Sequence, residues 1–219
     1  MTYTREEFVK KYGGFINIAV KGTGILQGTV LAQAIIESQA KMADGNWRVG
    51  ASTLSQQANN YFGIKCHSWK GKVYNIDTGE VAKDGTKYVE KNACFRAYDS
   101  VEDSILDYID FVQVNSNYRN AGYFEATTVK EQAEALKRAG YATSPTYAKT
   151  VTNVYNGIAD YAEKYKNYGA SGILKSFSYN PIGFVKRNKI ATLSAILVLS
   201  GLGIGTYLIV KKQIKWTQQ

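Results

Sequence analysis

The sequence predicts an α+β fold that is mainly α-helical, with one small antiparallel β-lobe and one transmembrane helix near the C-terminal end. Helical periodicity and capping signals recur through residues 1–168, β-forming residues cluster in 72–98, and residues 190–210 carry no charge. Hydrophobic residues make up 45% of the chain and charged residues 21%, which is ordinary for a globular protein and excludes a disordered chain.

Two helices are predicted near the N-terminus. Thr4 and Glu7 have the spacing of a capping box, and Gly13-Gly14 is expected to end the helix that they begin. The second helix is predicted over residues 26–41. Its apolar residues, which share one helical face, are Leu26, Val30, Leu31, Ala34 and Ile35.

Three further helices are predicted from their first residues. The signals are Ser100 before a stripe of Ile105, Ile109 and Val112, a capping box of Thr128 and Glu131, and Ser144 followed by Pro145. The last of these helices is expected to extend to about Tyr165. Residues 72–98 interrupt the helical pattern with β-formers, and turn signals at Thr78-Gly79 and Asp84-Gly85 predict a β-hairpin.

The C-terminal segment predicts a membrane anchor. Residues 190–210 are uncharged and flanked by lysines, and a helix of that length spans roughly 30 Å, the hydrocarbon thickness of a bilayer. We therefore expect a domain over 1–168, a linker and basic juxtamembrane segment over 169–189, the transmembrane helix over 190–210 and a short basic tail over 211–219. The polar N-terminus is not expected to be a secretory signal peptide.

The formal net charge of +9 favours polyanionic partners such as anionic lipid or an acidic cell-wall polymer. Nucleic acid is not expected as a partner, because the lysines are scattered and the sequence has no nucleic-acid-binding motif. Cys66, Cys94 and His67 do not have the spacing of a metal site, so we expect no metal and no organic cofactor.

Glu37 is the first candidate for chemistry. It shares a helical face with Val30 and Ala34, so its carboxyl projects from an apolar stripe. Desolvation there would raise its pKa, and a carboxyl that keeps its proton near neutral pH suits a general acid. The alternative is a solvated glutamate at the edge of the stripe.

The order of several motifs resembles glycoside hydrolase family 73, the peptidoglycan-hydrolysing glucosaminidases. The motifs are LAQAIIES (31–38), NNYFGIK (59–65), WKG (69–71), FRAYDS (95–100) and AGYATSPTYAKTV (139–151). The resemblance covers roughly residues 15 to 160 and implies a lysozyme-like fold, with a helical body and a β-lobe beside a long groove. It also implies that Glu37 is the general acid.

The resemblance places the second carboxylate in the β-lobe, separated from the WKG motif by eight residues. That count leads to Glu80, which would activate water or stabilise an oxocarbenium-like transition state. Glu90 and Asp77 compete for the role, and a solvated hairpin position remains the alternative for Glu80.

Further roles come from the same resemblance. Tyr141, in GYATSPTYA, is implied to place a catalytic hydroxyl near the scissile sugar. The implied substrate-binding residues are Asn60, Tyr61, Phe62, Trp69 and Tyr147, although Phe62 and Tyr147 also suit packing. Some relatives carry cysteines at the positions of Cys66 and Cys94, so a disulfide and two free thiols both remain open.

The sequence thus predicts a membrane-anchored hydrolase that cleaves the β-1,4 bond of peptidoglycan glycan strands after N-acetylglucosamine. A lytic transglycosylase and a non-catalytic, membrane-anchored glycan-binding protein are the alternatives. An anchor without a signal peptide leads us to expect a phage lytic enzyme held in the membrane of a lipid-containing virion, or otherwise a protein of the bacterial cell envelope.

Overall fold

The computed structural model describes residues 1–81 and 85–168. Its elements, in chain order, are α1 (Arg5–Ala19), α2 (Gln27–Ser38), β1 (Ala40–Lys41), β2 (Trp47–Arg48), α3 (Thr53–Ala58), β3 (Val73–Val81), β4 (Lys87–Arg96), α4 (Val101–Val114), α5 (Ser116–Asn120), α6 (Val129–Arg138), α7 (Tyr147–Asn156) and α8 (Ala159–Tyr165). The predicted linker, transmembrane helix and basic tail lie outside these residues. Within them, every helix is too short or too polar to cross a bilayer.

The predicted capping signals at Thr4–Glu7, Ser100 and Thr128–Glu131 are confirmed. The predicted helix start at Ser144-Pro145 is wrong, because Thr146 is the N-cap of α7 and the helix begins at Tyr147.

The predicted end of α1 is also wrong. Thr4 and Glu7 form a complete capping box, and the helix then continues through Gly13-Gly14 to Ala19. Gly14 has a packing reason, because a Cβ atom on it would lie 1.9 Å from the carbonyl oxygen of Tyr168. This glycine lets Tyr168 approach α1 closely instead of terminating the helix.

Two other predicted helix boundaries also need correction. α2 ends at Ser38 rather than residue 41, because Gln39 is extended and the chain then enters the two-stranded β1–β2 ribbon. The last predicted helix is two helices. α7 begins at Tyr147 and ends at Asn156, with Gly157 as its C-cap. α8 then begins at Ala159 and packs against α1.

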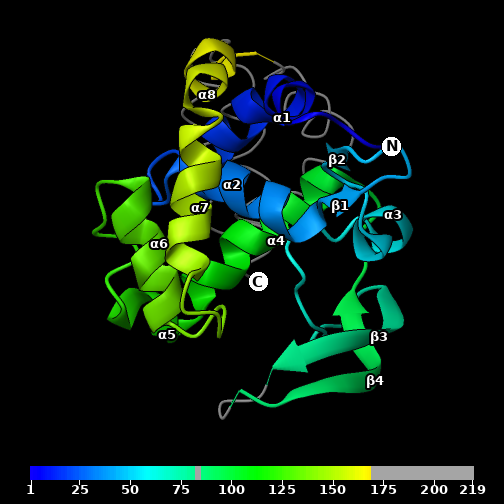
Figure 1. Cartoon of the computed structure of the whole chain (residues 1–219). Helices are drawn as coiled ribbons and strands as arrows, with labels where there is room; N and C mark the ends of the chain where they lie inside the picture. Colours follow the sequence, from blue (N-terminus) through cyan, green and yellow to red (C-terminus); the bar gives the residue numbers. More distant parts are fainter. Residues whose placement is uncertain (82–84, 169–219) are drawn as a thin grey trace, which may run out of the picture.

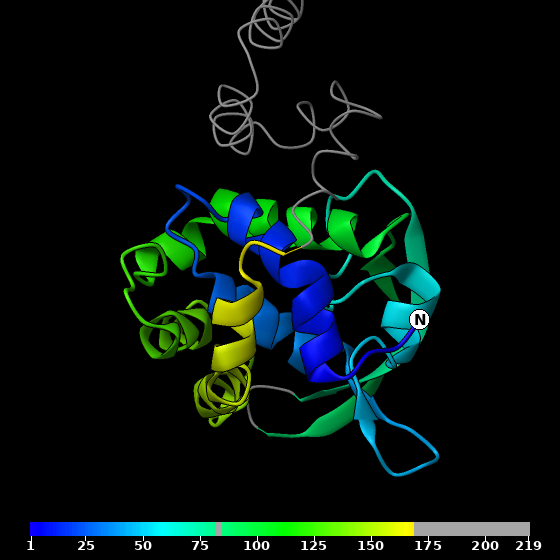
Figure 2. The same ribbon diagram turned by 90° about the horizontal axis from the view of Figure 1, so that it is seen from above.

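The predicted β-hairpin is confirmed as β3 and β4, which pair antiparallel from Val73 opposite Arg96 to Val81 opposite Lys87. Thr78-Gly79, predicted as a turn, lies inside β3 just after a register shift. Figure 1 shows the hairpin extending away from the helices, and Figure 2 shows it along one side of the helical body. The fold is therefore a helical body with a separate β-lobe.

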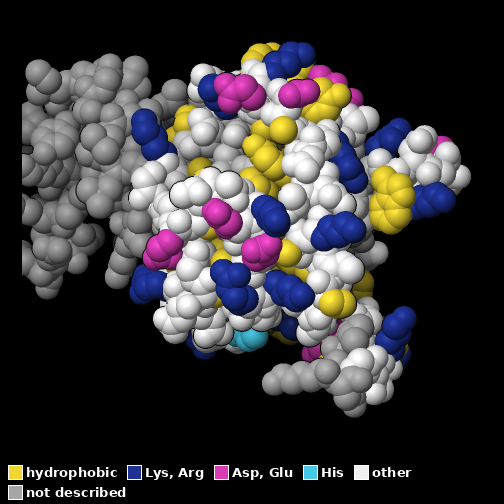
Figure 3. All heavy atoms as spheres, turned by 60° about the vertical axis from the view of Figure 1, so that its left-hand side comes forward, with side chains coloured by type: hydrophobic (Ala, Val, Ile, Leu, Met, Phe, Trp, Pro, Cys, Tyr) yellow, Lys and Arg dark blue, Asp and Glu magenta, His cyan; other side chains and the backbone are white. Residues whose placement is uncertain are grey.

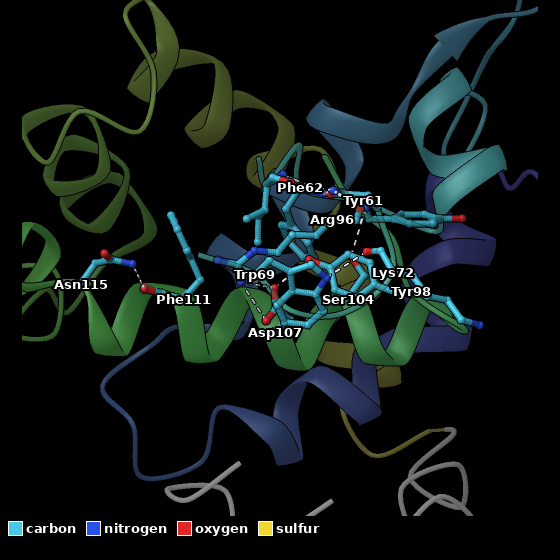
Figure 4. A network of polar contacts seen from close by, with 12 residues as sticks. Tyr61, Phe62, Trp69, Lys72, Arg96, Tyr98, Ser104, Asp107, Phe111 and Asn115 are labelled. Atoms are coloured by element: carbon cyan, nitrogen blue, oxygen red, sulfur yellow. Dashed lines mark hydrogen bonds and ion pairs between the residues drawn. The ribbon is translucent and has the colours of Figure 1, made fainter. Parts of the chain in front are cut away.

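The base of the hairpin is bound to α4 by a polar network (Figure 4). The Arg96 guanidinium donates two hydrogen bonds to Asp107, at 3.0 and 2.8 Å, and the Tyr98 hydroxyl donates to the same carboxylate at 2.7 Å. The indole of Trp69 covers the guanidinium at 4.9 Å. Both partners of the Arg96–Asp107 ion pair are mostly buried, so this contact fixes where β4 enters the body.

The core of the helical body fills the space between α1, α2, α4, α6 and α7. α2 runs through its middle with Val30, Leu31, Ala34 and Ile35 fully buried. Phe62, on the loop after α3, stacks on Tyr108 of α4 with ring centroids 4.2 Å apart. This core holds the last turn of α2, which carries Glu37, in a fixed position.

Candidate active site

Glu37 lies in the last turn of α2 and is half-buried. Its Oε1 accepts a hydrogen bond of 3.0 Å from the hydroxyl of Tyr147. Burial raises the pKa of the Glu37 carboxyl to about 7, while the Tyr147 hydrogen bond acts in the opposite direction by favouring the charged form. The predicted rise in pKa is confirmed, and the carboxyl can carry a proton near neutral pH.

The contact between Glu37 and Tyr147 depends on the close approach of α2 and α7. The two helices make extensive contacts, and Gly28 in α2 lies against the ring of Tyr155 in α7. A Cβ atom on Gly28 would come within 2.3 Å of that ring. Since Gly28 and Tyr155 meet at one end of the pair, Glu37 and Tyr147 meet at the other.

Tyr141 joins the same cluster, although its hydroxyl already has a partner. The hydroxyl donates a hydrogen bond of 2.7 Å to the carbonyl oxygen of Phe62. Its ring centroid lies 5.8 Å from that of Tyr147. Burial, followed by the nearby Tyr147 and Glu37, raises the pKa of Tyr141 far above its usual range. The Tyr141 side chain therefore stays neutral. It connects the loop after α3 with the residues around Glu37.

The predicted substrate-binding run 60–62 lies mainly in the interior. Asn60 is 1% exposed, and its side chain orders the loop by bonding the backbone of Phe62, Ile64 and Arg96. Tyr61 and Phe62 are each 2% exposed, with Tyr61 stacked on Phe8. These two side chains pack in the core, which leaves them almost no surface for a sugar.

Glu80 lies in β3, opposite Tyr88 of β4. Lys65 bridges it to a second carboxylate, since the ammonium nitrogen is 2.7 Å from Glu80 Oε1 and 2.6 Å from Glu90 Oε2. The structure thus brings two of the three competing β-lobe carboxylates to one cation. The third, Asp77, pairs with Lys91, and this contact lowers the pKa of Asp77.

Trp69 lies apart from the Glu37 cluster, at the base of the hairpin. It lines a cavity of about 420 Å³ together with Tyr98, Leu106, Asp107 and Asp110. Burial raises the pKa of Asp110 to about 6. The cavity gives Trp69 an accessible surface, while its indole also packs over Arg96.

Cys66 and Cys94 form a disulfide across 28 residues of chain. Beside it, the backbone amide of Cys66 donates to the carbonyl of Cys94 at 2.9 Å. Of the two possibilities that the sequence left open, the structure has the disulfide and not two free thiols. The disulfide attaches β4 to the segment that carries Lys65.

Two residues of the site were not found from the sequence. Gln33 is fully buried one helical turn before Glu37 and donates a hydrogen bond of 3.0 Å to the Tyr147 hydroxyl. Its position four residues before the acid, on the same helical face, was the available signal. Lys65 carried no such signal, because its two partners come from strands whose register a single sequence does not give.

In the described part of the chain, no three His, Cys, Asp or Glu side chains gather as they would around a metal ion. Figure 3 shows Lys and Arg side chains spread over one face and interleaved with Asp and Glu, rather than joined into one basic patch.

The profile of the glucosaminidase family, described as mannosyl-glycoprotein endo-beta-N-acetylglucosaminidase, matches residues 15–160. This chain belongs to the glucosaminidase family. The matched range contains every candidate site residue from Glu37 to Tyr147, so the carboxylates and tyrosines described above lie in the family domain.

Relatives and solved structures agree with this assignment. The peptidoglycan hydrolase FlgJ of Pseudomonas aeruginosa is 33% identical over 74% of this chain and 38% of its own length. The exo-glucosaminidase LytG of Bacillus subtilis is 31% identical over 68% of this chain and 50% of its own length. This chain thus matches half or less of either relative.

Among solved structures, a peptidoglycan hydrolase mutant from Sphingomonas sp. A1 superposes with a TM-score of 0.56 at 32% identity, over 70% of this chain and 94% of that one. The glycoside hydrolase domain of FlgJ from Salmonella typhimurium superposes with a TM-score of 0.51 at 28% identity, over 81% and 97%. The fold of this glucosaminidase domain is therefore that of known glycoside hydrolases, mainly helical with a small two-stranded sheet.

Proposed function

We propose that this glucosaminidase hydrolyses the glycan strands of peptidoglycan at the β-1,4 bond on the reducing side of N-acetylglucosamine. The observation that carries the proposal is Glu37, a half-buried carboxyl with a pKa of about 7 and a hydrogen bond from Tyr147. The names of FlgJ and LytG, a peptidoglycan hydrolase and an exo-glucosaminidase, support the substrate class.

In the proposed reaction, protonated Glu37 gives its proton to the glycosidic oxygen while the bond from that oxygen to C1 breaks. The Tyr147 hydroxyl then stabilises the Glu37 carboxylate that forms. Water attacks the oxocarbenium-like C1, and the second carboxylate accepts the proton released by the water or stabilises the positive charge. Tyr141, which is partly exposed, supplies aromatic surface beside the sugar, and Trp69 offers a further contact at the base of the hairpin. Tyr147 is 7% exposed, so it acts through its hydroxyl rather than as a sugar-binding surface.

Glu80 is the proposed second carboxylate, because eight residues separate it from the WKG motif, as in the family that the sequence resembles. Its side chain is also less exposed than that of Asp77, at 30% against 51%. We expect Glu80→Gln to lower the turnover of purified peptidoglycan about 100-fold, with Asp77→Asn close to wild type. Since Glu90 shares Lys65, Glu90→Gln is the matched control. A larger loss in Glu90→Gln than in Glu80→Gln would transfer the role to Glu90.

The decisive experiment digests purified peptidoglycan with the full chain in mild detergent, beside Glu37→Gln, and identifies the fragments by mass spectrometry. Reducing N-acetylglucosamine ends that are absent with the variant support the proposal, and internal fragments distinguish endo from exo cleavage. Anhydro ends would make the protein a lytic transglycosylase instead. Binding without cleavage would favour a non-catalytic glycan-binding protein.

We also propose that residues 190–210 anchor the enzyme in a lipid bilayer, in the virion membrane of a phage or otherwise in a bacterial envelope. The support is the uncharged run and its flanking lysines. Flotation of the full chain with phospholipid vesicles, compared with a variant carrying three lysines within 190–210, tests the anchor. Detection in host envelopes but not in purified virions would contradict the virion assignment.

A further inference from the structure

A row of buried polar side chains extends from Glu37 into the core of the helical body. Behind Tyr147 lies Gln33, and behind Gln33 lie Tyr108 of α4 and Tyr123, which follows α5; all three are fully buried. The Tyr108 hydroxyl donates to Gln33 Oε1 and lies 3.2 Å from the Tyr123 hydroxyl. Gln33 Nε2 donates to the Tyr147 oxygen at 3.0 Å, and Tyr147 donates to Glu37.

The direction of this row follows from the amide of Gln33, which has an accepting end and a donating end. Tyr108 occupies the accepting end, so the donating end faces the oxygen of Tyr147. Tyr147 has a single hydroxyl proton. Because its oxygen already accepts from Gln33, that proton is directed toward Glu37 rather than back into the core.

The burial of Gln33 also calls for an explanation. A polar amide in an apolar interior is tolerated when each end is hydrogen-bonded, and a leucine of similar size would fill the same space without that requirement. A second buried glutamine, Gln132, offers a contrast. Its side chain makes hydrogen bonds with the backbone of Gly24, Leu26 and Tyr123, so it stabilises the loops that carry these residues. The partners of Gln33 are instead two tyrosine hydroxyls, one of which contacts Glu37.

We propose that Gln33, held by Tyr108, is a positioning residue that directs the hydroxyl proton of Tyr147 to Glu37, so that the carboxylate left after proton transfer is stabilised. This inference rests on the proposed function of Glu37 as proton donor. It adds two residues, Gln33 and Tyr108, that act through Tyr147 and never touch the sugar.

The test is Gln33→Met, which preserves the length and apolar stem of the side chain and removes both hydrogen-bonding ends. We expect kcat on peptidoglycan to fall about tenfold, the size of one hydrogen bond to a charged group, with KM within twofold. The alkaline limb of the pH–rate profile, which requires protonated Glu37, is expected to move up by about one pH unit, because the carboxylate loses an aligned donor.

Two further variants keep the test decisive. Tyr147→Phe should move the alkaline limb to higher pH by a similar amount. The double variant Gln33→Met, Tyr147→Phe should move it no further, since both changes interrupt the same row of hydrogen bonds. Tyr108→Phe retains the ring in the core and should cause a smaller shift in the same direction; it replaces Gln33→Met if that variant does not fold. Gln132→Met is the matched control, expected to lower stability without moving the limb.

A second measurement separates this inference from the proposed function. The ¹³C-labelled Glu37 carboxyl can be titrated by NMR, with its signal assigned by its absence from Glu37→Gln, and the titration needs no turnover. A raised titration midpoint in Gln33→Met supports the positioning role even if peptidoglycan is not cleaved. An unchanged midpoint in Gln33→Met and Tyr108→Phe, or an equal shift in Gln132→Met, would overturn it.

Discussion

The two glutamates proposed for catalysis lie in regions of opposite character. Glu37 is held in the helical body, half-buried, with a neutral tyrosine hydroxyl as its hydrogen-bond partner. Glu80 lies on the hairpin with a side chain 30% exposed and with the Lys65 ammonium at 2.7 Å. Glycosidases that use two carboxyls separate their tasks through such differences in environment. The body suits a group that must hold a proton, and the hairpin suits one that meets water.

The two regions also differ in what stabilises them. The body buries whole aromatic and aliphatic side chains, among them Phe8, Phe15 and Tyr108. The outer part of the hairpin exposes Tyr88 and Val89 by about half, and burial in β4 begins only at Ala93 and Phe95. The hairpin therefore depends on its base, where the disulfide and the Arg96–Asp107 pair attach it to the body.

The largest expected contrast is in the cost of removing a side chain. Phe8→Ala empties a fully buried site and should lower the free energy of unfolding by about 3–5 kcal/mol. Val89 lies on the hairpin and is 56% exposed, so Val89→Ala should lower the free energy of unfolding by less than about 0.5 kcal/mol. Urea denaturation measures both values, and similar losses would show that the hairpin is as integral to the fold as the body.

The disulfide should matter almost as much, and mainly to the hairpin. A 28-residue loop corresponds to about 3–4 kcal/mol of stabilisation in the chain-entropy account. In a Cys66→Ser, Cys94→Ser double variant, amide exchange should accelerate in β3 and β4 while α2 and α7 stay protected. Equal acceleration in all four elements would mean that the two regions unfold together.

The third prediction concerns Glu37, whose burial should cost stability. In the unfolded chain the carboxyl has its usual pKa of 4.5, and in the folded domain the pKa is about 7. Between those values the folded state binds more protons, so stability falls as pH rises, and the cost is complete above pH 7. The shift corresponds to at most about 3 kcal/mol.

Glu37→Gln removes that cost. Its melting temperature should exceed that of wild type at pH 8 and equal it near pH 4, although the variant is expected to be inactive. The control is Glu80→Gln, which loses an ion pair and should show no such gain at pH 8. A Glu37→Gln variant no more stable than wild type at pH 8 would mean that Glu37 is solvated, the alternative that the sequence left open.

The contrast between the regions also explains what the sequence could predict. Signals contained within a few residues were sufficient, such as the capping box of Thr4 and Glu7 and the apolar stripe that placed Glu37. Gly13-Gly14 misled because Gly14 packs against Tyr168, which is distant in sequence, and Ser144-Pro145 misled because α7 uses Thr146 as its N-cap and begins at Tyr147. Short elements such as α3, α5 and the β1–β2 ribbon have too few residues to show a period.

The same limit applies to the site. Glu37 became a candidate from its own helix together with the motifs that resemble the family, but the contacts of Gln33 span 75 and 114 residues of chain to Tyr108 and Tyr147. The choice among Glu80, Glu90 and Asp77 likewise depends on the register of β3 against β4. Sequence reasoning located the proposed proton donor and the β-lobe, whereas the residues that contact Glu37 and Glu80 could be found only from the fold.

Replacing Lys65 should have only a small effect on stability, and it gives the clearest test of the hairpin's role. Its side chain is 34% exposed, so losing both ion pairs in Lys65→Met should cost about 1 kcal/mol or less. Lys91→Met is the matched control, because Lys91 also pairs with a carboxylate of the hairpin, Asp77, whereas Glu80 and Glu90 both pair with Lys65.

If Lys65 holds Glu80 in place for catalysis, Lys65→Met should lower kcat at low salt by far more than its stability loss suggests, while Lys91→Met remains near wild type. Raising the salt concentration toward 1 M, where the screening length is about 3 Å, should lower the wild-type rate toward that of Lys65→Met. A reversed pattern, with Lys91→Met the impaired variant, would assign the second carboxylate to Asp77.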